Sequence, residues 1–231
     1  MKKTMFLLLI SVLLLTLCGC DNEKNKENIT NMYIDVAKLT EEEKDIIELT
    51  GGKNAGHIFD FSLDENVKSM YINTYQLVNG EWKPINNRSS MAFSDIKGRL
   101  AVDFENGFDN LRIAIQSGNS NGSFSNTSDV EKDKYKGMGV STSLLANKTE
   151  VVYEKEIPLA IQIITSKNEV SSYIVEYFEK PEEYAKFDYE YVYAITVMFS
   201  EKELNHEDEE ALYLTRENEK DIYLLGNGIQ M

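Results

Sequence analysis

Apolar and polar residues alternate with a period of two along most of the chain after residue 56, as in strands that bury one face. This alternation predicts strands over 56–62, 67–78, 81–85, 100–104, 111–115, 140–145, 150–153, 159–165, 173–178, 189–199, 211–215 and 221–225. Residues 189–199 are apolar on both faces, which indicates a central strand covered on both sides.

Local signals add turns and a helix to this pattern. Asn79-Gly80 predicts a tight hairpin, because both residues tolerate the positive φ angles of a type I′ turn. Thr40 and Glu43 form a capping box, which predicts a helix over 41–49. Residues 181–184 predict a turn or a single helical turn.

Many short strands with one small helix favour an all-β fold, either an antiparallel β-sandwich or an open barrel, with one short N-terminal helix. The expected organisation is a signal peptide at 1–19, a lipidated N-terminus and flexible tether at 20–38, and a single globular domain at 39–231. Residues 117–128 are almost all Ser, Asn, Gly and Thr, a composition that predicts a mobile surface loop.

The first residues have the pattern of an export signal. Lys2 and Lys3 precede a 13-residue apolar run over 5–17. This run is shorter than the roughly 20 residues that a membrane-spanning helix needs, and it has the length of a secretory signal core. Gly19 and Cys20 follow, and the segment resembles the lipobox of bacterial lipoproteins, in which the cysteine is diacylated and becomes the first mature residue.

The resemblance implies that Cys20 carries the lipid. Cys18 stands where lipoboxes prefer Ala, Ser or Thr, but cleavage before Cys18 would place the bulky Leu17 at the cleavage position. A plain signal peptide cleaved elsewhere is the alternative. Two acyl chains, such as palmitate, would hold the mature protein stably on the outer face of the cytoplasmic membrane.

Removal of residues 1–19 leaves 212 residues and takes the formal net charge from −15 to −17. Such a charge repels nucleic acids and anionic lipid headgroups, so we expect no nucleic-acid partner and a membrane link through the lipid alone. Cys18 and Cys20 are the only cysteines, so the processed chain has no thiol for a disulfide, a metal site or a nucleophile. We expect no cofactor.

A hydrolase motif occurs within the predicted loop. Residues 118–122 fit G-x-S-x-G, with Ser120 at the position of the nucleophile, and Asp188 and His206 follow in the order of an α/β-hydrolase triad. The residues after 122 do not begin an apolar helix, and a loop rich in Ser, Asn and Gly matches this motif readily by chance.

Other catalytic and metal-binding patterns are incomplete. Ser94 and Lys97 fit S-x-x-K without the partner motif of that class. His57 and His206 are the only histidines and lie far apart in sequence, which argues against zinc and predicts surface or edge positions for both. Acidic clusters that could bind calcium lie at 64–66, at Asp103, Glu105 and Asp109, and at 207–210. None matches a calcium-loop motif, and a solvated acidic surface explains them.

Two tyrosine stripes could stack sugars, although strands also favour aromatic residues for packing. One consists of Tyr189, Tyr191 and Tyr193, and the other of Tyr71 and Tyr75. Core packing is the simpler explanation of both stripes.

Three segments, 40–44 with 49–52, 156–167 and 189–197, resemble a set of uncharacterised lipoproteins of low-G+C Gram-positive bacteria. The resemblance extends over 39–200 and implies no assigned activity and no functional residue. We therefore expect a membrane-anchored, extracytoplasmic lipoprotein that is not an enzyme and binds an unknown envelope protein or small ligand. A secreted serine hydrolase using Ser120, or a calcium-stabilised adhesin-like module, are the alternatives.

Overall fold

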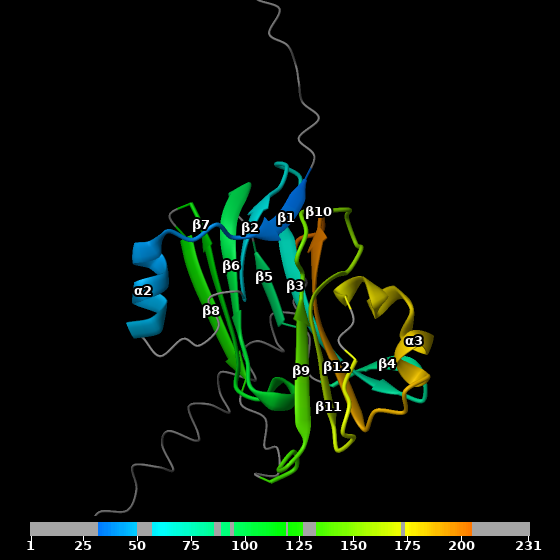
Figure 1. Ribbon diagram of the computed structural model, residues 1–231. Coiled ribbons are helices and arrows are strands. Elements are labelled where there is room, and N and C mark those ends of the chain that lie inside the picture. The colour runs from blue at the N-terminus through cyan, green and yellow to red at the C-terminus, as the bar shows by residue number, and fades with distance from the viewer. Residues whose placement is uncertain are drawn as a thin grey trace, which may run out of the picture. The chain divides into compact units, whose positions relative to one another are not determined.

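The computed structural model describes residues 32–49, 57–85, 89–92, 95–118, 120–126, 133–171 and 174–204. Within these residues two antiparallel six-stranded sheets pack face to face as a sandwich (Figure 1). The predicted all-β antiparallel sandwich with a short helix near the N-terminus is confirmed.

Sheet A has the strand order β10-β1-β2-β6-β7-β8. Its strands are β1 (Tyr33–Val36), β2 (Ile58–Ser62), β6 (Lys97–Asp103), β7 (Leu111–Ser117), β8 (Ser120–Asn126) and β10 (Thr149–Glu150). Burial alternates along β7 residue by residue, as the sequence pattern predicts, so one face of this sheet lies in the core and the other is exposed.

Sheet B has the order β4-β3-β12-β11-β9, and β5 pairs with the first half of β3. Its strands are β3 (Ser69–Val78), β4 (Glu81–Pro84), β5 (Ser89–Ala92), β9 (Gly139–Leu144), β11 (Ile157–Thr165) and β12 (Tyr191–Ser200). Asn79 and Gly80 have φ angles of 54° and 79°, which confirms the predicted hairpin between β3 and β4. The prediction that residues 189–199 form a central strand is also confirmed, because β12 lies between β3 and β11.

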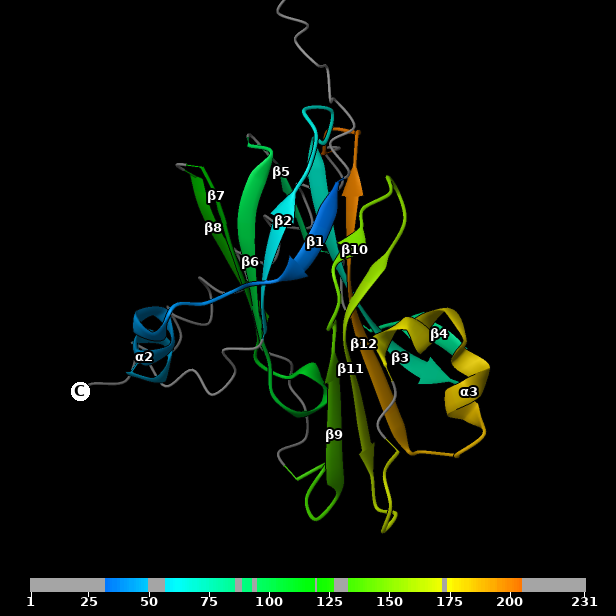
Figure 2. The same cartoon turned by 45° about the horizontal axis from the view of Figure 1, so that its top comes forward.

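Short helices lie on opposite sides of the two sheets. Figure 2 shows α2 (Glu41–Leu49) beside sheet A, and α3 (Pro181–Ala185) beside β4 of sheet B. Single 3-10 turns are η2 (Asn106–Phe108) and η3 (Val175–Glu179). The capping box of α2 is formed as predicted: the Thr40 amide donates to the Glu43 carboxylate at 2.8 Å, and the Glu43 amide donates to the Thr40 hydroxyl at 3.2 Å.

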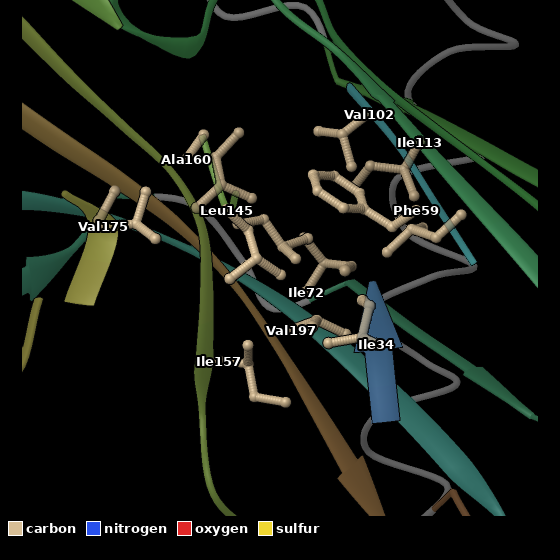
Figure 3. Close-up of a cluster of buried hydrophobic side chains, with 14 of the residues drawn as sticks. Ile34, Phe59, Ile72, Val102, Ile113, Leu145, Ile157, Ala160, Val175 and Val197 are labelled. Atoms are coloured by element: carbon tan, nitrogen blue, oxygen red, sulfur yellow. The ribbon is translucent and has the colours of Figure 1, made fainter. Parts of the chain in front are cut away.

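The core fills the space between the sheets. Ile34, Phe59 and Ile113 enter it from sheet A, and Ile72 and Val197 enter it from sheet B (Figure 3). The outer face of sheet B is also covered, by side chains that include the buried Val175 of η3 and Tyr184 of α3. This second layer explains why β12 is apolar on both faces.

The first strand begins inside the segment expected to be the flexible tether. Tyr33–Val36 forms β1, which pairs with β2 on one side and β10 on the other, and Ile34 is fully buried. A four-residue strand after a polar run is too short to give a periodic signal, so the sequence does not predict it. The tether up to residue 31 and Cys20 lie outside the described residues.

Three other assignments are wrong. The strand predicted at 150–153 is limited to the two-residue β10, and residues 151–153 are not in a strand. The predicted loop at 117–128 contains β8, a strand formed by pairing with β7 although its own residues have little strand preference. The predicted strand at 173–178 is largely η3, because a short apolar run does not distinguish a strand from a helical turn. The predicted helical turn at 181–184 is confirmed as α3. The hairpin predicted over 211–225 lies outside the described residues.

Candidate functional site

The G-x-S-x-G motif does not have the backbone of a nucleophile elbow. Ser120 begins β8 and is the register partner of Ser117 in β7, so the residue is followed by a strand and not by a helix. An elbow needs the sharp strand-to-helix turn to present its serine. Asp188 lies in the turn after α3 with a φ of 50°, and both His206 and Ser94 lie outside the described residues.

His57 is buried and precedes β2, an inner strand of sheet A, so the predicted surface or edge position is wrong. Its ring stacks on Phe104 with centroids 4.8 Å apart, and its Nδ1 has no hydrogen-bond partner among the described residues. Burial lowers the pKa of His57, against smaller opposite effects of the Val102 backbone and the Asp103 charge. The neutral imidazole therefore packs in the interior immediately before β2.

In the acidic cluster at 64–66, the Asp64 carboxylate is hydrogen-bonded within the fold. The Tyr153 hydroxyl contacts both carboxylate oxygens of Asp64 at 2.5 Å, and the Asn66 amide donates to the same carboxylate at 2.9 Å. Burial, and then the bond to Asp64, raises the pKa of Tyr153 to about 12. Across the described ranges, no group of three or more His, Cys, Asp or Glu side chains has the arrangement of a metal site.

The tyrosine stripe of β12 packs mainly into the molecule. Tyr193 is almost fully buried, and its hydroxyl lies 2.8 Å from that of Tyr135. Its ring is parallel to the ring of Tyr191 at 6.2 Å, and Lys134 Nζ lies 4.9 Å from the Tyr191 ring centre. Burial and the bond to Tyr135 raise the pKa of Tyr193 far above its ordinary range.

A buried polar bridge lies beside this cluster. Gln162 on β11 accepts a hydrogen bond from the Gly107 amide at 2.6 Å and donates one to the Thr142 hydroxyl at 3.3 Å. Gly107 has a φ of 71°, and a Cβ at this position would lie 2.2 Å from the Tyr135 hydroxyl. The residues at this end of the sandwich are therefore tightly packed.

The outer face of sheet A carries a hollow of about 390 Å³ whose lining includes Arg99, Ala101 and Ala114. Arg99 donates to Asp60 at 2.8 Å and to Glu43 of α2 at 2.7 Å. Those two carboxylates raise the pKa of the guanidinium, Asp60 more than Glu43. The positive charge in this hollow is therefore already matched by the protein.

A smaller cleft lies between the two sheets, where β5 and β8 are the outer strands. We call it the edge cleft; it has a volume of about 120 Å³ and is lined by Met70, Ile72, Ser89, Ser90, Met91, Ile113, Gly122, Ser123 and Phe124. Met70 and Met91 are direct partners across β3 and β5, and Ile113 and Phe124 are direct partners across β7 and β8. An apolar pair from each sheet therefore lines the cleft.

The edge cleft has a buried floor and a half-exposed mouth. Met70, Ile72 and Ile113 are buried, whereas Met91 and Phe124 are partly exposed. The methyl group of Met91 lies 2.1 Å from the position that a Cβ of Gly122 would occupy. Met91 can lie across the opening between the sheets because residue 122 has no side chain.

Similarity to known proteins gives no indication of what this chain does. The chain matches no family model, no curated protein and no solved structure. In the part of the chain that the structure describes, no helix is both long enough and apolar enough to cross a membrane.

The sequence does not predict the edge cleft. Its lining comes from four strands, and two of these, β5 and β8, have no periodic apolar signal. The one trace is the lone Phe124 in a polar stretch, which becomes interpretable only once its partner Ile113 is known.

Proposed function

We propose that this chain is a lipid-anchored, non-enzymatic binding protein on the outer face of the cytoplasmic membrane, and that its edge cleft takes an apolar group of the ligand. The observation that carries this proposal is the apolar pair that each sheet contributes to the cleft, Met70 with Met91 and Ile113 with Phe124. An apolar pocket with a few small polar groups is the usual form of a ligand site.

The volume of the edge cleft limits what can enter it. At about 120 Å³ it is slightly smaller than an apolar cavity of roughly 150 Å³ that holds benzene in another protein. The group bound is therefore the size of an aromatic ring or a branched aliphatic side chain. Met70 and Met91 have flexible side chains that adapt to groups of different shape. A small envelope ligand or a side chain of an envelope protein meets this description.

The proposed location is supported by the N-terminal signal pattern and by charge. The processed chain has a formal net charge of −17, which opposes binding to an anionic membrane surface without a lipid. A lipid at Cys20 would hold the protein on the membrane in spite of the repulsion between its negative charge and anionic headgroups.

The test uses the full chain with 13C-labelled methionine methyl groups, observed by NMR during titration with benzene. We expect saturable shifts of the Met70 and Met91 methyl signals, because both side chains line the edge cleft. Met198 provides an internal control, because it is buried on β12 and does not line the cleft.

Two variants of one residue make the test specific. Phe124→Trp reduces the space at the mouth and should weaken benzene binding, whereas Phe124→Ala enlarges it and should admit naphthalene. Titrations without saturable shifts at Met70 and Met91, or with the same affinity in Phe124→Trp, would refute binding in the edge cleft.

A further inference from the structure

The carboxylate of Glu156, immediately before β11, is half-buried and has no cation beside it among the described residues. Its Oε1 accepts hydrogen bonds from Asn73 Nδ2 and from the Tyr75 hydroxyl, each at 2.5 Å. The adjacent Lys155 forms its ion pair with Glu179 instead, at 3.0 Å. A charge removed from water without an opposite charge is costly, so a cation at this carboxylate would be stabilised.

Aromatic rings continue from this carboxylate across the outer face of sheet B. The Tyr75 ring lies 5.7 Å from that of Phe178, and the Phe178 ring stacks on Trp82 at 5.1 Å. Trp82 Nε1 donates to the Phe178 carbonyl at 2.8 Å, which fixes the indole relative to η3. All three rings are partly exposed, so part of their surface is accessible to a ligand.

A buried hydroxyl nearby lacks a hydrogen-bond partner within the described residues. Thr196 is fully buried, and its Oγ1 forms no hydrogen bond there. Thr196 is the direct cross-strand partner of Asn73, so the two side chains lie on the same face of the sheet. Orphaned buried hydroxyls are rare and call for an explanation, such as a group that completes the polar cluster.

We infer that Glu156, Tyr75, Phe178 and Trp82 form a binding site for an organic ammonium ion, which we call the ammonium site. The carboxylate would pair with the positive charge, and the ring faces would attract it through their negative quadrupoles. The strongly acidic chain would also raise the local concentration of cations. The ammonium site lies on the outer face of sheet B and the edge cleft lies between the sheets, so neither proposal depends on the other.

Trp82 is the only tryptophan of the chain and stacks on Phe178, so intrinsic tryptophan fluorescence reports on the aromatic side of the ammonium site. The experiment titrates the full chain, in nonionic detergent, with choline and with the neutral compound in which carbon replaces the choline nitrogen. We expect a saturable change of Trp82 fluorescence with choline only. Glucose serves as a neutral sugar probe, because aromatic rings beside a carboxylate could also bind a sugar.

Glu156→Gln removes the charge and keeps an oxygen that can accept from Asn73 and Tyr75. We expect it to weaken choline binding by about tenfold or more. Glu176→Gln is the matched control, because it removes the same charge from an exposed position on η3 and should bind choline like the native protein. Circular dichroism of both variants establishes that they fold.

The outcomes are distinct. No saturable change, an equal response to the neutral isostere or to glucose, or undiminished binding in Glu156→Gln would each overturn the ammonium site. Vesicles of phosphatidylcholine, compared with free choline, distinguish a lipid headgroup from a soluble amine as the source of the cation.

Discussion

At the scale of single residues, a position can require glycine for two reasons: a positive φ angle, or a lack of space for a side chain. Gly107 and Gly137 allow these two reasons to be distinguished. Gly107 and Gly137 have φ angles of 71° and 79°, a region that side chains disfavour. A Cβ at Gly107 would collide with Tyr135, whereas a Cβ at Gly137 would meet nothing within 4 Å. Both positions therefore favour glycine because of their positive φ angles, but only Gly107 also lacks space for a side chain.

We expect Gly137→Ala to lower the free energy of unfolding by about 1–2 kcal/mol, the backbone penalty alone. Gly107→Ala should cost about 1–3 kcal/mol more, because Tyr135 must move and its contact with Tyr193 is disturbed. Urea denaturation of both variants measures the difference. Equal losses of unfolding free energy in the two variants would show that Tyr135 moves aside without an energetic cost.

His57 makes stability depend on pH. The pKa of His57 is lowered in the folded state, from 6.5, so below that pH the unfolded chain takes up a proton that the folded chain does not. The free energy of unfolding should therefore fall as the pH drops below 6.5, and level off below the folded pKa. Glu190 acts in a lower window: its pKa is lowered to about 2, mainly by Ser166 and Thr165, so its contribution is lost as the pH falls below 4.5.

Denaturation of the native chain and of His57→Phe, between about pH 7.5 and about pH 5, isolates the histidine effect. We expect the native chain to lose more stability over this range than the variant. Identical pH dependence in both proteins would count against a buried neutral His57.

At the scale of elements, the sequence predicts the helices and strands that are marked by a local turn or capping motif or by a long apolar run. The β3–β4 hairpin follows from Asn79-Gly80, α2 from its capping box, and β12 from its long, mostly apolar run. β1 and β8 were not predictable, because each is held by its neighbours more than by its own composition. The edge cleft depends on β5 and β8, so it could not be predicted either.

The helix α2 is attached weakly. None of its residues is buried, Leu49 is 87% exposed, and its link to sheet A includes the ion pair of Glu43 with Arg99. An ion pair that remains partly exposed to solvent contributes little to stability, so α2 should open locally while the sheets stay folded.

Hydrogen exchange measured by mass spectrometry tests this attachment. Amides of α2 should exchange at least about 100-fold faster than those of β12, whose opening requires global unfolding. Thr40→Ala removes half of the capping box and should speed exchange in α2 further without changing β12. Protection of α2 equal to that of β12 would contradict local opening.

At the scale of the whole molecule, the proposed anchor can be tested by metabolic labelling with an alkyne fatty acid. We expect the native chain to be labelled and to sediment with membranes, and Cys20→Ser to lose both properties. Cys18→Ser is the matched control and should remain labelled, because it leaves the acylated residue in place. Loss of label in Cys18→Ser with retention in Cys20→Ser would move the lipid to the other cysteine.

The position of β1 has a mechanical consequence for a protein tethered in this way. Among the described residues β1 is the strand nearest the N-terminus, and it has neighbours on both sides, β2 and β10. Tension between a bound ligand and the membrane would therefore enter the fold through a strand inside a sheet. Pulled along its axis, β1 would yield by shearing several hydrogen bonds at once, so the domain would resist tension at the point where its tether begins.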